Sequence, residues 1–262
     1  MTFQSACVVG AGRAGKAIAA RLAERLSTRS TGRELDWAGA DLVLLCVPDR
    51  SIAEVAGEIP PGPWIVHTSG ACALAALDPH VRRFSVHPLQ TFTLERGPEQ
   101  LDGAWAAVSG ESEEALAAGL ELARLLGLRP FELADEDRPI YHAGATVAAG
   151  FLVTLHEVAA ELLRAAGAPP EALEPLMRRT IENGFAHTGP HVRGDWETIE
   201  RHLEAIREHC PHLEPVYQLL SQKTALLLGD RREEALTKNR ALDAGGFSFG
   251  RPFARRAKGR VV

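Results

Sequence analysis

The sequence predicts an α/β fold, in which a doubly wound sheet is followed by an all-α C-terminal domain. Short apolar runs of strand length alternate with helix-like patterns over the first 135 residues. A glycine-rich turn directly follows the first of these runs. Beyond residue 137 the strand pattern gives way to long segments rich in Ala, Leu and Glu. We therefore expect two domains, at residues 1–135 and 136–262.

Strands of the first domain are expected where apolar residues cluster. The run 42–47 is apolar at every position, which is typical of a parallel strand buried on both faces. Helical spacing is clearest at Ala14, Ile18, Leu22 and Leu26. The predicted strands are 5–9, 25–30 (the weakest), 41–47, 64–68, 83–86, 105–108 and 129–133, and the predicted helices include 13–26 and 112–126.

The second domain is expected to be helical throughout. Glycine and proline at 167–170, 188–190 and 210–211 separate one helical pattern from the next. The predicted helices are 137–166, 171–185, 195–208, 213–228 and 231–240. We expect the basic end, 251–260, to be a solvated tail rather than a phosphate-binding segment.

The composition is that of an ordinary globular protein, with 45% hydrophobic and 24% charged residues. A net charge of -5 provides no basic field for a nucleic acid or an anionic membrane. The first strand leaves no room for a signal peptide, and no apolar run approaches the ~20 residues of a membrane-spanning helix. We therefore expect a cytoplasmic protein that acts on a small molecule, with no nucleic acid and no membrane as partner. The histidines and cysteines show no metal-ligand spacing, so no metal is expected.

The glycine-rich turn after the first strand has the pattern G-x-G-x-x-G and reads Gly10-Ala11-Gly12-Arg13-Ala14-Gly15. It lies between a strand and an Ala-rich helix, which is the setting in which a Rossmann domain binds a dinucleotide. The first glycine permits the tight turn, the second lets the pyrophosphate approach the backbone, and the third lets the helix pack on the strand. A glycine-rich turn without a ligand is the alternative.

The choice of cofactor depends on the end of the second strand, where NAD-binding domains carry an Asp or Glu for the ribose hydroxyls. Here the segment 27–31 offers Arg29 and Ser30 instead. An arginine among hydroxyl donors suits a 2′-phosphate, so we favour NADP(H) over NAD(H). If the strand ends nearer Glu34 or Asp36 the preference reverses, and an ordinary exposed turn is the third alternative.

Several phrases spread over nearly the whole chain resemble one family. They are Val47-Pro48-Asp49, His67-Thr68-Ser69-Gly70, Ser85-Val86-His87-Pro88-Leu89-Gln90-Thr91-Phe92, Tyr141-His142-Ala143, Thr188-Gly189-Pro190 and Arg193-Gly194-Asp195. They resemble the Rossmann-like proteins with a C-terminal domain of unknown function 2520. Such proteins are similar in plan to pyrroline-5-carboxylate reductase, ketopantoate reductase and the 6-phosphogluconate dehydrogenase superfamily, so the resemblance implies reduction of C=N or C=O bonds with NAD(P)H.

The sequence departs from that family at two places. Ala149-Gly150 stand where the family would carry a Ser-Asn pair, so a polar group directed at the substrate is missing there. The second strand is also abbreviated, which bears on the choice of cofactor.

Residues that directly follow the strands are the first candidates for the site, because the ligand crevice of a doubly wound sheet lies beyond the carboxyl ends of its strands. Val47 and Pro48 are expected to pack on the cofactor, with Asp49 capping the next helix. Thr68 and Ser69 place hydroxyl and amide groups near the nicotinamide. Ser69 has the alternative role of capping a helix.

His87 is the main catalytic candidate, with Gln90 three residues away. Hydride delivery to a carbonyl or imine needs a proton donor, and His titrates closest to neutral pH. His142 and Thr146, one helical turn apart at the start of the long helix, are the second candidates. Arg193 is the candidate for binding a substrate carboxylate. A structural His87 bonded to backbone and a packing role for His142 are the alternatives.

We therefore expect an NADP(H)-dependent oxidoreductase that reduces a C=O or C=N bond of a small oxo or imino acid, with a ketopantoate-like acid as the first guess. One alternative is a non-catalytic NADP(H)-binding regulatory protein, which the missing Ser-Asn pair favours. Another is a reductase that exchanges hydride between a deazaflavin and NADP. A homodimer and a monomer both fit the Ala-rich helices.

Overall fold

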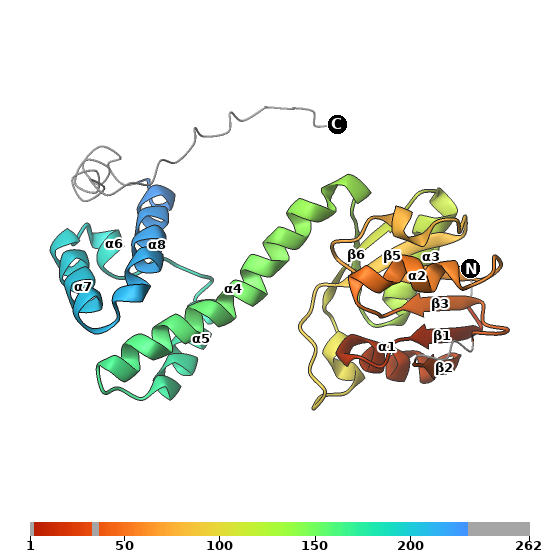
Figure 1. Ribbon diagram of the computed structural model, residues 1–262, viewed down its shortest axis with the longest axis horizontal. Coiled ribbons are helices and arrows are strands. Elements are labelled where there is room, and N and C mark those ends of the chain that lie inside the picture. The colour runs from red at the N-terminus through yellow and green to blue at the C-terminus, as the bar shows by residue number, and fades with distance from the viewer. Residues whose placement is uncertain (1–2, 33–36, 230–262) are drawn as a thin grey trace. The chain divides into compact units, whose positions relative to one another are not determined.

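A computed structural model describes residues 3–32 and 37–229 (Figure 1). The chain divides into two compact units, residues 1–153 and 154–262. The domain boundary that we expect after residue 135 stays a prediction. The expected helix 231–240, the basic end 251–260 and the alternative strand end at Glu34 or Asp36 lie outside the described residues.

The first unit is built on a seven-stranded sheet with the order β2-β1-β3-β4-β5-β6-β7. The strands from β1 to β5 are parallel, β6 runs antiparallel to β5, and β7 is again parallel to β6. The predicted α/β fold with its doubly wound sheet is confirmed. Its strands are β1 (Ser5–Val9), β2 (Ser27–Thr31), β3 (Leu42–Leu45), β4 (Trp64–His67), β5 (Arg83–Pro88), β6 (Trp105–Gly110) and β7 (Arg129–Glu132).

The reversal at β6 has a simple cause in the connection that precedes it. A parallel neighbour needs a crossover, usually through a helix, whereas an antiparallel one can be reached by a loop. The chain between β5 and β6 holds only the short helix η3 (Pro98–Leu101). From β6 to β7 the helix α3 (Glu113–Leu125) provides the crossover, and the parallel direction returns.

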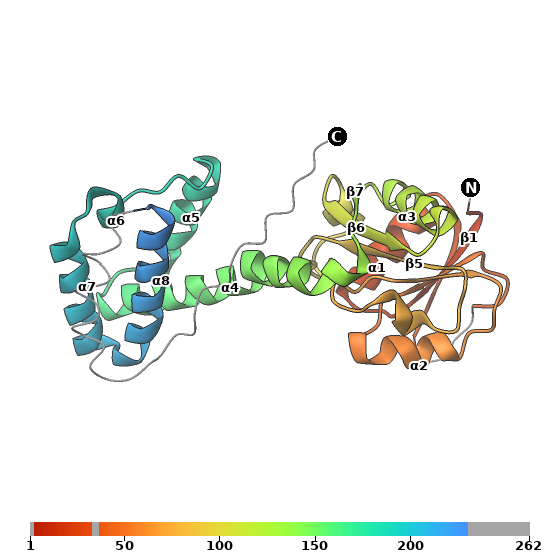
Figure 2. The same ribbon diagram turned by 90° about the horizontal axis from the view of Figure 1, so that it is seen from above.

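Alternate residues of the strands contribute to two separate cores, and helices cover both faces of the sheet (Figure 2). One core joins residues such as Val8 and Leu44 to α1 (Arg13–Ala23) and α3. The other joins Val9 and Leu45 to α2 (Ile52–Gly57). A sheet covered on both faces in this way explains why its central strands β1, β3 and β4 are apolar at nearly every position.

Strand order also locates the ligand crevice. The chain passes from β1 to β2 on one side, and β3 pairs with β1 on the other side. The sheet therefore has its switch point between β1 and β3, where the loops beyond the carboxyl ends diverge and leave room for a ligand.

The described part of the second unit is helical, as predicted. Its small core joins Ile206, Cys210 and Leu213 to Val158 and Leu162. Asp195 caps α7 by accepting a hydrogen bond from the amide of Thr198. The helices of the second half of the chain are α4 (Arg138–Ala165, which begins in the first unit), α5 (Leu173–Glu182), α6 (Pro190–Arg193), α7 (Trp196–His209) and α8 (Glu214–Leu227).

Helix α4 is unusually apolar for an exposed helix. The segment Asp135–Ala165 is the only one among the described residues that is long and apolar enough to cross a membrane by length and composition, with a mean hydropathy of 1.4 over a window that is 6% buried. The expectation that no apolar stretch approaches this length is therefore wrong. The small residues Gly and Ala and the polar Thr and His that are interspersed along it hide the stretch from a search for an uninterrupted apolar run.

Candidate functional site

The glycine-rich turn is shaped for a close backbone approach at two of its three glycines. Gly10 has φ +114°, and a Cβ there would lie 2.4 Å from the carbonyl oxygen of Cys46. A Cβ on Gly15 would lie 2.0 Å from the carbonyl oxygen of Gly10. Both positions therefore require glycine, because the neighbouring backbone cannot move aside.

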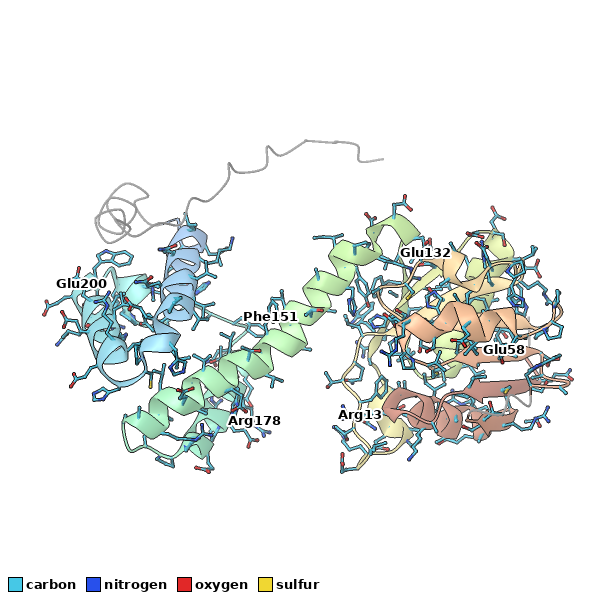
Figure 3. All side chains as sticks on the ribbon, in the orientation of Figure 1. Arg13, Glu58, Glu132, Phe151, Arg178 and Glu200 are labelled. Atoms are coloured by element: carbon cyan, nitrogen blue, oxygen red, sulfur yellow. The ribbon has the colours of Figure 1, made fainter. Side chains whose placement is uncertain are left out.

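Gly12 differs from the other two glycines, because a Cβ there would meet no atom within 4 Å. It is the N-cap of α1, which begins at Arg13 (Figure 3), and it provides no side-chain cap for the first-turn amides. An uncapped helix N-terminus beside open space is what a pyrophosphate requires. The turn therefore fits a dinucleotide.

The second strand ends at Thr31, and Arg29 and Ser30 are exposed on it. The guanidinium of Arg29 donates a hydrogen bond to the carbonyl of Ala38, across the connection to β3. Arg29 is thus held near the carboxyl end of β2. Its role in binding a 2′-phosphate stays a prediction.

The residues after β3 and β4 lie at the same edge of the sheet as the glycine turn, since β1, β3 and β4 are parallel neighbours. Val47 is half-buried and Pro48 is exposed. The amide of Thr68 donates to the carbonyl of Leu45, 3.3 Å away. The hydroxyl of Ser69 accepts from the amides of Ala71 and Cys72, at 3.1 and 3.0 Å. These two bonds favour the structural alternative for Ser69.

His87 near the end of β5 pairs with Tyr141, which was not among the predicted catalytic residues. Its Nδ1 lies 2.7 Å from the hydroxyl of Tyr141, on the first turn of α4. The two rings meet edge to face with centroids 5.5 Å apart. Tyr141 precedes the candidate His142 directly in the sequence, and helical spacing alone does not tell which of two neighbouring side chains faces the sheet.

Gly70 separates the two candidate histidines. A Cβ at this position would lie 2.7 Å from Cε1 of His87 and 2.8 Å from Cδ2 of His142. The centroids of the two imidazoles are 6.1 Å apart. The loop after β4 therefore packs its backbone against both rings, and His87, Tyr141, His142 and Gly70 form one cluster at the carboxyl edge of the sheet, which we call the histidine cluster.

The electrostatics of the cluster keep His87 neutral. Burial, with smaller contributions from the nearby His142 and Arg138, lowers the pKa of His87 to about 4, whereas Asp49 acts in the opposite direction. Burial raises the pKa of Tyr141 to about 12. At neutral pH the pair thus consists of a neutral imidazole and a protonated phenol, which share a proton across their hydrogen bond.

Residues 104–224 match the family described as "Domain of unknown function (DUF2520)". The chain contains a DUF2520 domain. The resemblance noted from the sequence phrases is thereby confirmed. The DUF2520 domain includes Tyr141 and His142, while His87 and Gly70 precede it. The histidine cluster therefore combines residues of this domain with residues that come before it in the sequence.

Several solved structures share this fold, and the match extends over nearly the whole length of each of them. A proposed NADP oxidoreductase from Bacteroides fragilis is 23% identical, with a TM-score of 0.69 over 85% of this chain and 98% of that chain. A protein from Thermotoga maritima is 24% identical, with a TM-score of 0.68 over 84% and 98%. The 1-pyrroline-5-carboxylate reductase of Streptococcus pyogenes is 17% identical, with a TM-score of 0.55 over 86% and 97%. No curated protein sequence matches this chain.

The remaining candidates of the DUF2520 domain are Thr146 and Arg193. Thr146 donates its hydroxyl to the backbone carbonyl of His142, 2.9 Å away on α4. Arg193 ends α6 in the second unit, and its contact with a substrate stays a prediction.

Gln90, which precedes the DUF2520 domain, is engaged by the loop that follows β5. Its Nε2 donates to the carbonyl of Gln100 at 3.0 Å, and its Oε1 accepts from the amide of Thr91 at 2.9 Å. These contacts favour a structural role for the Gln90 side chain over a catalytic one. No three His, Cys, Asp or Glu side chains gather as metal ligands within the described part of the chain.

Proposed function

We propose that the protein is an NADP(H)-dependent oxidoreductase that reduces a C=O or C=N bond of a small oxo or imino acid, with a ketopantoate-like acid as the first candidate. The observation that carries this proposal is the hydrogen-bonded His87–Tyr141 pair. It lies at the carboxyl edge of the sheet, where the glycine turn also lies. Structurally similar chains include a 1-pyrroline-5-carboxylate reductase and an imine reductase, which supports the same class of reaction.

The cofactor would be held by the glycine turn and by the residues after β3 and β4. The first-turn amides of α1 would bind the pyrophosphate, and Gly12 would let it approach. Val47 and Thr68 would line the path beyond it, and Arg29 would bind the 2′-phosphate that distinguishes NADP from NAD. The bound nicotinamide supplies a hydride.

The chain itself supplies the proton that must accompany the hydride. We assign the protonated phenol of Tyr141 as the donor to Nδ1 of His87, so that the neutral ring carries its proton on Nε2. When the substrate oxygen or nitrogen takes the Nε2 proton, Nδ1 takes the proton of Tyr141. The phenolate that results is reprotonated from solvent. His142, across Gly70, is the alternative donor.

A regulatory protein that binds NADP(H) without turnover is the second candidate. Ala149-Gly150 in α4 provide no polar side chain where the resembled family has a Ser-Asn pair. A protein of this kind would keep the glycine turn and lose catalysis.

We further propose that a second copy of the chain covers α4 in a cytoplasmic homodimer with no membrane or nucleic acid partner. No charged side chain occurs between Arg138 and Glu157. Val147, Phe151 (labelled in Figure 3) and Leu155 lie one helical turn apart and are 57%, 55% and 37% exposed. Light scattering should give twice the chain mass, and Val147→Asp with Phe151→Asp should give the monomer. Sedimentation with lipid vesicles would instead support a membrane.

The function is tested first by binding and then by turnover. Tryptophan fluorescence is titrated with NADPH and NADH, and oxo and imino acids are then screened for NADPH consumption. Binding with turnover that His87→Ala abolishes supports the reductase. Binding without turnover of any acid supports the regulatory protein, and no binding of either cofactor overturns both.

A further inference from the structure

Arg138, the first residue of α4, is a buried charge that the proposed chemistry leaves unexplained. Its side chain is completely buried and is the largest one so buried among the described residues. A buried arginine is costly unless its donors are satisfied, so such a residue usually holds something in place.

The donors of Arg138 reach three separate segments. Nε donates to Oδ1 of Asp135 at 2.6 Å, and Nη1 donates to the carbonyl of Ser69 at 3.1 Å. Nη2 donates to the hydroxyl of Ser85 on β5. Asp135 in turn accepts the amide of Leu74, at 3.1 and 3.0 Å from its two oxygens. One guanidinium thus ties the start of α4 to the loop after β4 and to β5.

These bonds run beside the contacts of the histidine cluster. Tyr141 is three residues after Arg138 on the helix, an advance of about 4.5 Å. His87 is two residues after Ser85 on the strand and on the same face of it, an advance of about 6.6 Å. The bond from Arg138 to Ser85 and the bond between Tyr141 and His87 are therefore successive links between the same helix and the same strand.

The loop after β4 repeats this arrangement. Arg138 holds the carbonyl of Ser69, and the next residue, Gly70, packs against His142, which is four residues after Arg138 on the same helical face. Two contacts of the cluster, Tyr141 with His87 and His142 with Gly70, thus each have a bond from Arg138 one or two residues earlier on the partner segment.

We propose that Arg138 is a positioning residue, which sets the first turn of α4 so that Tyr141 and His142 meet His87 and Gly70. The positioning role itself does not depend on the proposed function; only its effect on catalysis rests on that function. Because Arg138 is buried, it acts through these neighbours and does not touch the substrate.

The test measures the pKa of His87 by NMR titration of its imidazole in the protein without cofactor, so that no substrate is needed. The groups that face His87 are Tyr141, His142 and Arg138 on α4 and Asp49 after β3. Tyr141→Phe removes one hydrogen bond and should shift this pKa in the otherwise unchanged chain. With Arg138→Met the same Tyr141→Phe change should shift it far less, because Tyr141 is no longer held against His87.

Ser85→Ala and Arg138→Lys keep a positive charge at position 138 and keep the test valid if Arg138→Met does not fold. Each should weaken the effect of Tyr141→Phe in the same direction. Arg21→Met is the matched control, since Arg21 on α1 is also buried and its Nη1 lies 2.8 Å from Oδ1 of Asp102. It should lower the melting temperature and leave the titration of His87 unchanged.

An equal shift from Tyr141→Phe in all backgrounds would mean that the contact between Tyr141 and His87 does not depend on Arg138 and would overturn the proposal. If the protein turns over no substrate but the coupling is found, the proposed function fails and the positioning role stands. If a substrate is found, Arg138→Lys should lower kcat by about tenfold or more and leave NADPH affinity unchanged.

Discussion

The hydroxyl of Tyr141 lies 2.7 Å from Nδ1 of His87, which joins two residues that are 54 positions apart in the sequence. The phenol comes from the first turn of α4 and the imidazole from β5. Neither residue could take part in a proton relay alone, because a neutral imidazole that gives up its proton needs a second proton on its other nitrogen.

Removing the phenol should therefore slow turnover without affecting the cofactor. For Tyr141→Phe we expect kcat to fall by about 10²-fold, within the usual range of acid–base contributions, with NADPH affinity unchanged. Steady-state kinetics and fluorescence titration measure the two quantities. Tyr217→Phe is the control, because Tyr217 makes the same 2.7 Å bond to Nδ1 of His202 in the second unit. An equal loss in both variants would contradict the relay.

Acid should destabilise the protein through its buried histidines. Burial lowers the pKa of His87 to about 4 and that of His67 to about 3, both below the ordinary 6.5. The unfolded chain therefore binds more protons than the folded one between these values and 6.5, so the stabilisation is complete above pH 6.5 and is lost as the pH falls toward 4. Urea unfolding at a series of pH values measures this slope. His87→Gln should reduce the slope, while His209→Gln, at an exposed position, should not.

Gly70 should tolerate no side chain. Its Cβ would lie 2.8 Å or less from both imidazoles, so the rings of His87 and His142 would have to move apart. We expect Gly70→Ala to cost about 1–3 kcal/mol of unfolding free energy and to lower turnover. Chemical denaturation and kinetics measure these effects. Gly57→Ala in α2, where a Cβ meets nothing within 4 Å, should leave both unchanged or raise stability.

Substitutions at two glycines of the turn should have different effects, one on stability and the other on cofactor binding. Gly15→Ala puts a Cβ 2.0 Å from the carbonyl oxygen of Gly10 and should lower the melting temperature. A Cβ on Gly12 meets no atom within 4 Å, but Gly12→Val should weaken NADPH binding by about tenfold or more, because the pyrophosphate would approach there. A Gly12→Val variant with unchanged affinity would count against the cofactor site.

Arg29 decides the proposed preference for NADP(H). Arg29→Ala should weaken NADPH binding by about tenfold through the loss of a charge-assisted bond and leave NADH binding unchanged. Arg25→Ala is the control, because Arg25 precedes β2, away from its carboxyl end, and donates to the carbonyl of Leu125. Equal losses for the two cofactors would show that Arg29 does not contact a 2′-phosphate.

The sheet could be predicted from the sequence because strands buried on both faces are apolar at every position, as Leu42–Leu45 are. The glycine turn could be predicted because its conformation forces glycine at Gly10 and Gly15. The antiparallel β6 could not, since direction depends on a connection and not on the strand's own residues.

Much of the histidine cluster escaped prediction for a related reason. His87 and His142 could be predicted as candidates because a histidine is a common proton donor. Tyr141 and Arg138 could not, because their roles depend on the partners that the fold brings to them. Gly70 has an ordinary φ, so only the two rings around it reveal its importance.

Strand β5 alternates two kinds of position along its length. Phe84 and Val86 belong to the core beneath α1 and α3, whereas Ser85 and His87 contact the first turn of α4. Natural variation could therefore change the chemistry of this strand at odd positions while its even positions keep the domain folded. A new substrate preference could be acquired here by point substitution, but the insertion of a single residue would exchange the two sets and forfeit both.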